Sequence, residues 1–258
     1  MSPRRDADRA GERVRTVTLL GSDYPNLGEV ATASLAPATG LALSRGRYPK
    51  SYAHLDPNED AAFAAWGSQG SLALVADGHN GFDAALAAVL AARQLAEEAL
   101  AGEGLAEAHD LETVVGRLAS RIANGVARKV DGAPADRRHS RTALTAILML
   151  PGGTAIVHAG DTAALRIRSG RPRRLTKPRP FIGRDEGAPG TQSLRTRAGD
   201  RLVLASDGIV DYLGQNSTAA VARLAATGSP EAAGRALVEA AMAGGAGDHL
   251  AAVVVDVR

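Results

Sequence analysis

Residues 74–81 read Leu-Val-Ala-Asp-Gly-His-Asn-Gly, so an apolar run passes directly into an aspartate that is followed by glycine. The same order returns at residues 202–208, where Leu-Val-Leu-Ala-Ser leads into Asp207 and Gly208. Short apolar runs of this kind are typical of buried strands, and a following glycine lets the backbone turn sharply and approach a ligand. Both segments therefore predict a buried strand that delivers a carboxylate to one end of a sheet.

The surrounding sequence predicts further strands and helices. Apolar runs between glycine-rich or proline-rich turns indicate strands, and apolar residues three and four positions apart indicate helices. The expected elements are hairpins of 61–66 with 71–76 and of 193–197 with 201–205, helices at 82–100, 111–130 and 230–242, and strands at 142–150, 154–159, 163–168 and 250–257. Because strands follow one another rather than alternating with helices, the pattern predicts an α+β fold with mainly antiparallel sheets and helices packed outside.

A single folded domain is expected over residues 29–258. A chain of 258 residues can form one large or two small domains, and no linker-like stretch divides this one. Residues 1–13 are charged and aperiodic, and residues 21–28 are rich in turn-forming residues. Structure is therefore expected to begin near Glu29, with residues 1–28 as an N-terminal segment that is either flexible or outside any family resemblance.

The composition excludes several classes of protein. The chain has no cysteine, which rules out disulfides, thiolate catalysis and cysteine-ligated metal centres. A net charge of +2 is too small to imply a nucleic-acid partner. No apolar stretch approaches the roughly 18 residues of a membrane span, and the charged N-terminus lacks a signal-peptide core. We expect a cytoplasmic monomer with no membrane or nucleic-acid partner, and the excess of arginine over lysine is typical of a GC-rich bacterial genome.

Carboxylates recur at other expected strand ends. Asp161 follows the strand at 154–159, Asp248 precedes the last strand, and Glu59 and Asp60 precede the strand at 61–66. Each aspartate taken alone more often marks a turn than a metal site. Their shared position nevertheless indicates that up to six carboxylates meet at one edge, where like charges raise one another's pKa values and a divalent cation resolves the conflict. Oxygen ligands favour Mg²⁺ or Mn²⁺, and a metal pair about 3.5–4 Å apart can activate water for attack on phosphorus.

Taken together, these blocks resemble the metal-dependent, type 2C serine/threonine protein phosphatases, especially the compact bacterial members. The matching blocks, in the family's order, are residues 58–60 (NED), 74–81 (LVADGHNG), 160–162 (GDT), 202–213 (LVLASDGIVDYL) and 247–248 (GD). The resemblance runs from residue 58 to the C-terminus and implies a four-layer α-β-β-α sandwich with two mainly antiparallel central sheets. It also implies hydrolysis of phosphoserine and phosphothreonine in proteins by a metal-activated water, in opposition to a serine/threonine kinase in signalling.

The resemblance further implies a set of metal ligands for two Mn²⁺ or Mg²⁺ ions. Asp77 would bridge both ions. The Gly78 carbonyl and Glu59 would serve one ion, and Asp207 and Asp248 would serve the other.

Three further positions receive roles from the same resemblance. Asp60 would hold metal-bound water, and Asp161 would form a weaker third metal site together with Asp207. His79 would be the general acid that protonates the departing seryl or threonyl oxygen, since its unperturbed pKa near 6.5 leaves a protonated fraction at neutral pH. A histidine that is merely solvated or supports a ligand is the alternative at this position.

The sequence departs from the family's pattern at Leu55, at His249 and at Lys177-Pro178, where the family's Asp-His after a Leu-Thr element is absent. Leu55 stands where the family usually has an arginine that grips the substrate phosphate, so Arg47, Lys50 and His54 are the candidates to bind phosphate instead. His249 stands where an asparagine commonly follows the last metal-binding aspartate, which would change the groups that support that ligand. These departures keep open a catalytically weak module that binds phosphoproteins, and a phosphatase for small metabolites is the other alternative.

Overall fold

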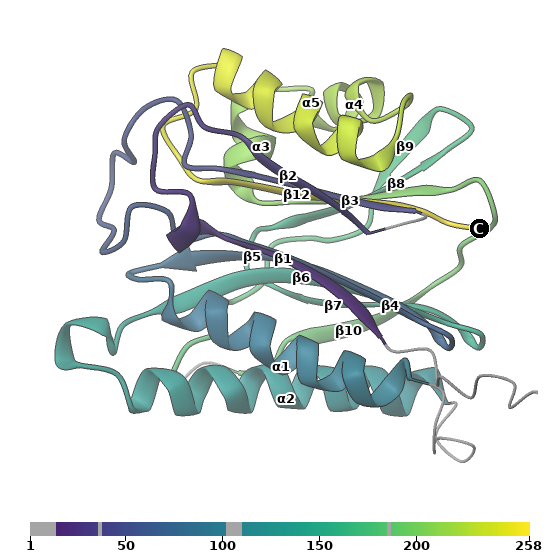
Figure 1. Ribbon diagram of the computed structural model, residues 1–258, viewed down its shortest axis with the longest axis horizontal. Coiled ribbons are helices and arrows are strands. Elements are labelled where there is room, and N and C mark those ends of the chain that lie inside the picture. The colour runs from purple at the N-terminus through teal and green to yellow at the C-terminus, as the bar shows by residue number, and fades with distance from the viewer. Residues whose placement is uncertain (1–13, 36–37, 102–109, 185–186) are drawn as a thin grey trace, which may run out of the picture.

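The computed structural model describes residues 14–35, 38–101, 110–184 and 187–258 (Figure 1). Its centre is a pair of six-stranded sheets that lie face to face. In spatial order the first sheet contains β1 (Arg15–Leu20), β4 (Ala61–Gly67), β5 (Gly70–His79), β6 (Arg141–Leu150), β7 (Gly153–Ala159) and β10 (Gly190–Leu194). The second sheet contains β2 (Ala31–Leu35), β3 (Thr39–Ser44), β12 (Leu250–Asp256), β11 (Arg201–Ala205), β8 (Ala163–Arg168) and β9 (Arg171–Arg174). Neighbouring strands pair antiparallel in both sheets.

Helices cover the outer face of each sheet. The long helices α1 (Asp83–Ala99) and α2 (Leu111–Asp131) pack against the first sheet, and α5 (Pro230–Ala243) with the short α3 (Asp207–Tyr212) and α4 (Ser217–Leu224) covers the second (Figure 1). Ser229 caps α5 by accepting the Ala232 N–H. The predicted four-layer α-β-β-α sandwich is thereby confirmed. Within the described ranges, no helix has both the length and the apolar character needed to span a bilayer.

Strand alternation decides which side chains reach the space between the sheets. In β5, Leu72 and Leu74 pack toward α1 and α2, whereas Ala73 and Val75 belong to the core between the sheets. Successive side chains of a strand point to opposite faces, so Asp77 continues the inner set. The acid therefore lies at the open end of the sandwich, between the two sheets.

Two expectations about the elements are wrong. Strand β1 begins at Arg15 and pairs with β4, so the folded domain starts well before residue 29. The expected hairpin of 193–197 with 201–205 does not form, because β10 pairs with β7 in the first sheet whereas β11 lies between β12 and β8 in the second. Gly199, at a φ of 86°, turns the chain as it passes from one sheet to the other. Residues 1–13 lie outside the described ranges.

Candidate metal centre

The predicted acids meet at one end of the sandwich. Ala61 pairs with Ala76, so the start of β4 places Asp60 at the same end as Asp77. Asp207 is the first residue of α3, just after β11, and its carboxyl is close enough to Asp77 for each to affect the pKa of the other. Asp248 lies two residues before β12, and its charge acts on both Asp60 and Asp207. The structure therefore brings together the carboxylates of what we call the acid cluster: Glu59, Asp60, Asp77, Asp207 and Asp248.

Asp161 lies next to the cluster, in the loop that connects β7 of the first sheet to β8 of the second. Ligand atoms of Asp77, His79 and Asp161 all lie within 4.8 Å of one another, which is close enough for a shared cation. Burial and the Asp77 charge raise the pKa of Asp161 above its usual value. Its place beside Asp77 is the one expected for a third metal ligand.

The acid cluster carries more negative charge than it can hold unaided. Burial, reinforced by the charges of Asp77 and Asp248, raises the pKa of Asp207 to about 10. Burial and the Asp77 charge likewise raise the pKa of Asp60 well above its usual range. Asp77 is instead stabilised as an anion: burial opposes its ionisation, but the adjacent His79 ring and the Lys50 charge lower its pKa to about 2. Cations are needed to keep Asp60 and Asp207 ionised at neutral pH.

Several buried carboxylate oxygens have no hydrogen-bond donor in the described part of the chain. They are Glu59 Oε2, both Asp60 oxygens, Asp77 Oδ2 and Asp161 Oδ1. Buried polar atoms are nearly always satisfied in native proteins, so such a set needs a ligand. Clustered hard oxygen donors without sulfur suit Mg²⁺ or Mn²⁺.

Two glycines let the elements of the centre approach one another. A Cβ added to Gly78 would lie 2.5 Å from the Glu59 carbonyl oxygen, and one added to Gly208 would lie 2.2 Å from the His249 carbonyl oxygen. Both distances are impossible for a real side chain, so only glycine allows these contacts. The Asp-Gly pairs that mark the sequence are thus explained by close packing around the acids.

Glu59 is held by the backbone more than the sequence suggests. Its Oε1 accepts hydrogen bonds from the amides of Gly81 (2.6 Å), Leu55 (2.9 Å) and Asp56 (3.3 Å), which leaves only Oε2 facing the cluster. The Glu59 amide in turn donates to His249 Nδ1 at 3.1 Å. Burial and the nearby Lys50 charge lower the pKa of His249 to about 3, so the imidazole stays neutral and accepts. His249, which stands where the family commonly has asparagine, therefore helps to hold Glu59 in position.

His79 lies beside Asp77 at the mouth of the centre. Its Nε2 is 3.5 Å from Asp77 Oδ2, and its ring packs edge-on against Phe181 with centroids 4.8 Å apart. Burial lowers the pKa of His79, but the adjacent Asp77 carboxylate outweighs burial and raises it. A protonated imidazole with its side chain only 16% exposed is a suitable proton donor for a leaving group.

The three phosphate-binding candidates have different locations. Lys50 is buried in the acid cluster, with Nζ 3.2 Å from Asp248 Oδ1 and 4.0 Å from Glu59 Oε2. Burial lowers the pKa of Lys50, but the surrounding acids outweigh burial and raise it, so the ammonium is charged. Arg47 instead lies over the Tyr48 ring, and His54 packs edge-on against His249. Of the three, only Lys50 contacts the cluster.

An ionic network that the sequence did not reveal holds the segment before Glu59. Arg137 donates from both terminal nitrogens to the Asp56 carboxylate (2.7 and 2.8 Å) and also contacts Asp83 Oδ2 at 3.1 Å. The Phe82 amide donates to the same Asp56 carboxylate at 3.0 Å. The network joins this segment to the start of α1, next to the Glu59 contacts.

Replacing Arg137 with glutamine is expected to destabilise the fold by about 2 kcal/mol, or about 4–8 °C in Tm, since two buried acids lose a charged donor. Burial raises the pKa of Asp56, but Arg137 and the Phe82 amide outweigh burial and lower it below the ordinary 3.8. The stability that Arg137 and the Phe82 amide provide by binding ionised Asp56 is therefore fully present above pH 3.8. It is lost as the pH falls through the lower pKa that Asp56 has in the folded protein. Thermal unfolding of both proteins over a pH series should show the difference shrinking in acid. A gap that is independent of pH would contradict this assignment.

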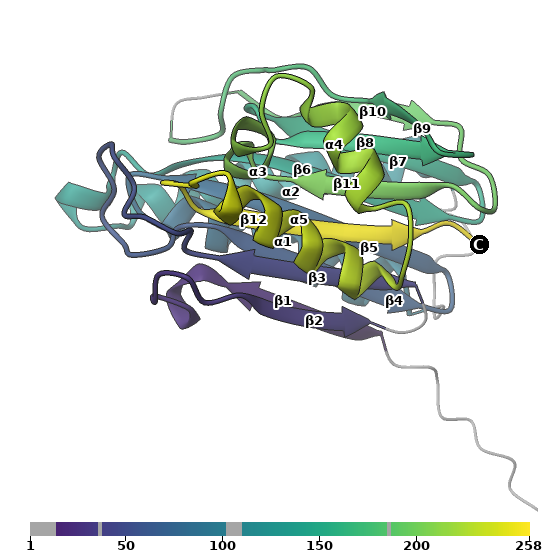
Figure 2. The same cartoon turned by 90° about the horizontal axis from the view of Figure 1, so that it is seen from above.

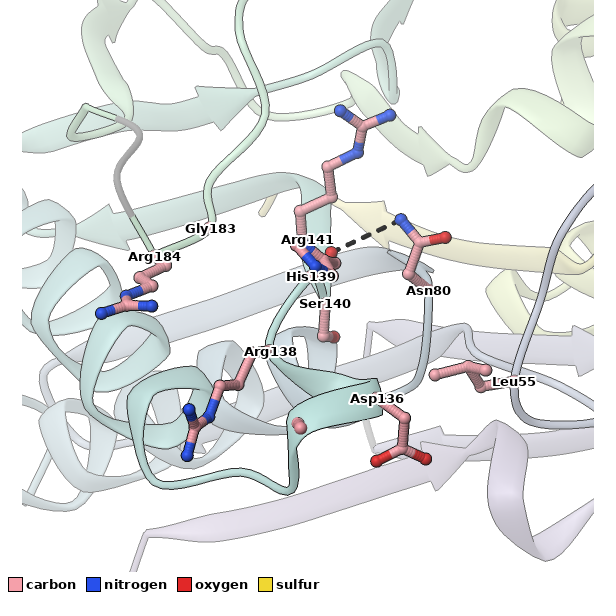
Figure 3. Close-up of a pocket in the computed structure, with 10 residues that line it drawn as sticks. Leu55, Asn80, Asp136, Arg138, His139, Ser140, Arg141, Gly183 and Arg184 are labelled. Atoms are coloured by element: carbon pink, nitrogen blue, oxygen red, sulfur yellow. Dashed lines mark hydrogen bonds between the residues drawn. The ribbon is translucent and has the colours of Figure 1, made fainter.

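A pocket of about 730 Å³ is lined by Asn80, which follows His79 in the chain, and by Arg141, which lies opposite His79 in β6 (Figure 3). Arg138, Arg141 and Arg184 line it, together with Asn80, whose side chain donates to the His139 carbonyl oxygen. Arg141 pairs with His79 across β5 and β6, and its guanidinium lies 4.8 Å from the centre of the Phe181 ring that also packs on His79. The pocket is therefore rich in arginine and lies next to the β5–β6 pair that carries His79.

Comparisons with known proteins agree with this arrangement. A family model described as stage II sporulation protein E (SpoIIE) matches residues 69–258. The serine/threonine protein phosphatase PstP of Mycobacterium tuberculosis is 29% identical over 232 residues, which cover 78% of this chain and 42% of PstP. This chain therefore spans less than half the length of that relative.

Solved structures share the fold. The catalytic domain of PstP in complex with two manganese ions has a TM-score of 0.67 and 22% identity, with 88% of this chain and 99% of that one covered. PppA, a regulatory component of the type VI secretion system in Pseudomonas aeruginosa, has a TM-score of 0.65 and 20% identity, with 89% and 98% covered. Since the family model matches most of its length, the chain belongs to the stage II sporulation protein E (SpoIIE) family.

Proposed function

We propose that this chain hydrolyses phosphoserine and phosphothreonine in proteins with the help of two Mn²⁺ or Mg²⁺ ions. The observation that carries the proposal is the convergence of buried acids with unpartnered oxygens at the end of the sandwich. The 29% identity to the phosphatase PstP supports the same activity. The substrate would be a protein that a serine/threonine kinase phosphorylates, so this enzyme would reverse the action of that kinase. It would act as a monomer in the cytoplasm.

The acid cluster supplies the proposed ligands. Asp77 would bridge the two ions, Glu59 Oε2 and the Gly78 carbonyl would serve one, and Asp207 with Asp248 would serve the other. Bound divalent ions would polarise a phosphoryl oxygen and make water a competent nucleophile at neutral pH.

The remaining proposed roles concern protons and a further ion. Asp60, whose two oxygens lack donors in the described chain, would accept a hydrogen bond from the attacking water. As the bond from phosphorus to the seryl or threonyl oxygen breaks, His79 Nε2 would donate its proton to that oxygen. Asp161, beside Asp77, would complete a third and weaker cation site.

The basic pocket favours a protein substrate over a small metabolite. A volume of about 730 Å³ next to the β5–β6 pair exceeds what a phosphate group needs, and it can hold residues that flank the phosphorylated side chain. Arg141 has an exposed side chain with no carboxylate partner among the described residues, whereas Arg184 pairs with Asp131 at 2.7 Å. An acidic residue next to the phosphorylated one would therefore be recognised at Arg141.

Replacing Arg141 with glutamine is expected to lower kcat/KM about tenfold for phosphothreonine peptides with acidic flanks, because one charge-assisted contact is lost. Peptides with neutral flanks and p-nitrophenyl phosphate should lose much less. Arg93→Gln, an exposed arginine on α1 that pairs with Glu97, is the matched control. An equal loss for all three substrates would show that Arg141 does not read the flanking sequence.

Steady-state phosphate release tests the proposed function itself. We expect release from phosphothreonine peptides to exceed that from small metabolic phosphoesters in the presence of Mn²⁺. Turnover of the small esters alone would identify a metabolite phosphatase. Peptide binding without phosphate release would identify a binding module.

A further inference from the structure

Lys50 places a positive charge inside the proposed metal centre. Its side chain is 1% exposed, and Nζ lies 3.2 Å from Asp248 Oδ1 and 4.0 Å from Glu59 Oε2. Nζ also lies 4.9 Å from the centre of the Tyr52 ring. A lysine is almost never buried unless its charge is compensated, so the acids hold this side chain in place.

Lys50 and Tyr52 both contact the Asp248 carboxylate. Its Oδ1 accepts the His249 amide at 2.8 Å and faces the Lys50 ammonium, and its Oδ2 accepts the Tyr52 hydroxyl. Neither Asp248 oxygen is among the unpartnered atoms, in contrast to those of Asp60. An ion could bind Asp248 only after these contacts loosen.

The segment that carries both residues is suited to such a movement. Residues 49–54 contain no helix or strand, and in the described part of the chain no backbone hydrogen bond ties them to either sheet. The chain is anchored before them, where the Arg47 and Tyr48 amides donate to the Ala246 carbonyl oxygen. It is anchored after them by the Leu55 and Asp56 amides on Glu59. Tyr52 is 47% exposed, so its ring borders solvent.

We propose that Lys50 is a built-in competitor for metal at Asp248, which supplies one compensating positive charge to the acid cluster when the ion is absent and must leave Asp248 when an ion binds. The inference rests on the proposed function only in taking Asp248 as a metal ligand. A monovalent ammonium and a divalent ion repel each other strongly at a few ångströms in a buried site. Lys50 and Tyr52 therefore set how much free metal is needed to load the centre.

The test is calorimetric titration of the metal-free protein with Mn²⁺, comparing the wild type with Lys50→Met. Methionine keeps much of the side-chain length and removes the charge, so the dissociation constant of one site should fall at least tenfold. Lys177→Met, an exposed lysine with the same change of charge, is the matched control and should leave the affinity unchanged. An unchanged or weaker affinity in Lys50→Met would overturn the proposal.

Thermal unfolding gives a second readout that does not depend on activity. In EDTA, Lys50→Met should melt below the wild type because the acids lose their only internal ammonium among the described residues. With saturating Mn²⁺ the gap should close or reverse, since the ion replaces the lost charge. A gap of the same size in both conditions would make Lys50 a structural residue and overturn the competition.

The outcomes also separate this inference from the proposed function. If both proteins bind Mn²⁺ equally, the metal centre stands and the competition is refuted. If neither binds, the proposed metal centre fails and the competition fails with it. Binding by Lys50→Met alone would support the competition in its strongest form.

Discussion

Replacing Asp77 with asparagine is expected to lower kcat/KM for a phosphothreonine peptide at least about 1,000-fold, equivalent to about 4 kcal/mol of transition-state stabilisation. Asp77 is 2% exposed, has a pKa lowered to about 2 by its neighbours, and presents an oxygen with no donor in the described chain. Asparagine matches its shape but removes the charge and one oxygen ligand. Rates measured over a range of Mn²⁺ concentrations, with calorimetric affinity, check the prediction.

The control for that prediction is Asp23→Asn. Asp23 is exposed in the short helix η1 (Gly21–Asp23), so the same chemical change there should leave both affinity and rate within about twofold. If Asp77→Asn retained more than a tenth of the wild-type kcat/KM while still folded, Asp77 could not be the central ligand.

Replacing His79 with glutamine is expected to lower kcat for the phosphothreonine peptide by about 10²–10⁴-fold, the range typical of a lost general acid. The loss for p-nitrophenyl phosphate should be far smaller, because nitrophenolate is a stable anion that leaves without a proton. The ratio of the two losses is the diagnostic quantity, and it can be measured in one assay at a single pH.

A structural role for His79 predicts a different result. His79 Nε2 lies 3.5 Å from Asp77 Oδ2, so its loss could act through the ligand instead of the leaving group. In that case both substrates should slow equally, and Mn²⁺ affinity should weaken with them. Equal losses would therefore remove the general-acid role while leaving the metal centre intact.

The sequence predicts the acid-bearing strand ends well because their signal is local. Because β5 and β11 are buried, each has a continuous apolar run, and that run ends at or just before the acid: Asp77 lies inside β5, which continues to His79, and Asp207 follows β11. The close approach of elements at Gly78 and Gly208 explains why each acid is followed by glycine. These local rules place the cluster before any contact between distant segments is known.

The two incorrect predictions about the fold have nonlocal causes. Two strands separated by a Gly-Asp turn suggest a hairpin, but β10 and β11 each find a partner in a different sheet. Strand β1 is only partly buried, with a pattern that gives little periodic signal, and it is positioned by pairing along β4. Propensity within a short window cannot distinguish these pairings from a local turn.

The residues that surround the acids are the least predictable part of the centre. Lys50 and Tyr52 lie in a stretch without periodic pattern, and they meet Asp248 across about 200 residues of sequence. Arg137 likewise reaches Asp56 from the short helix η2 (Ala135–Arg137). A buried lysine among acids leaves no mark on the sequence, since its charge is compensated only in three dimensions.

The most direct test of the account is removal and return of the metal. Protein stripped with EDTA should release no phosphate from a phosphothreonine peptide above the uncatalysed rate, and added Mn²⁺ or Mg²⁺ should restore turnover in parallel with occupancy of the acid cluster. Full activity in EDTA, or metal occupancy without turnover of any phosphoester, would contradict metal-dependent hydrolysis at this centre.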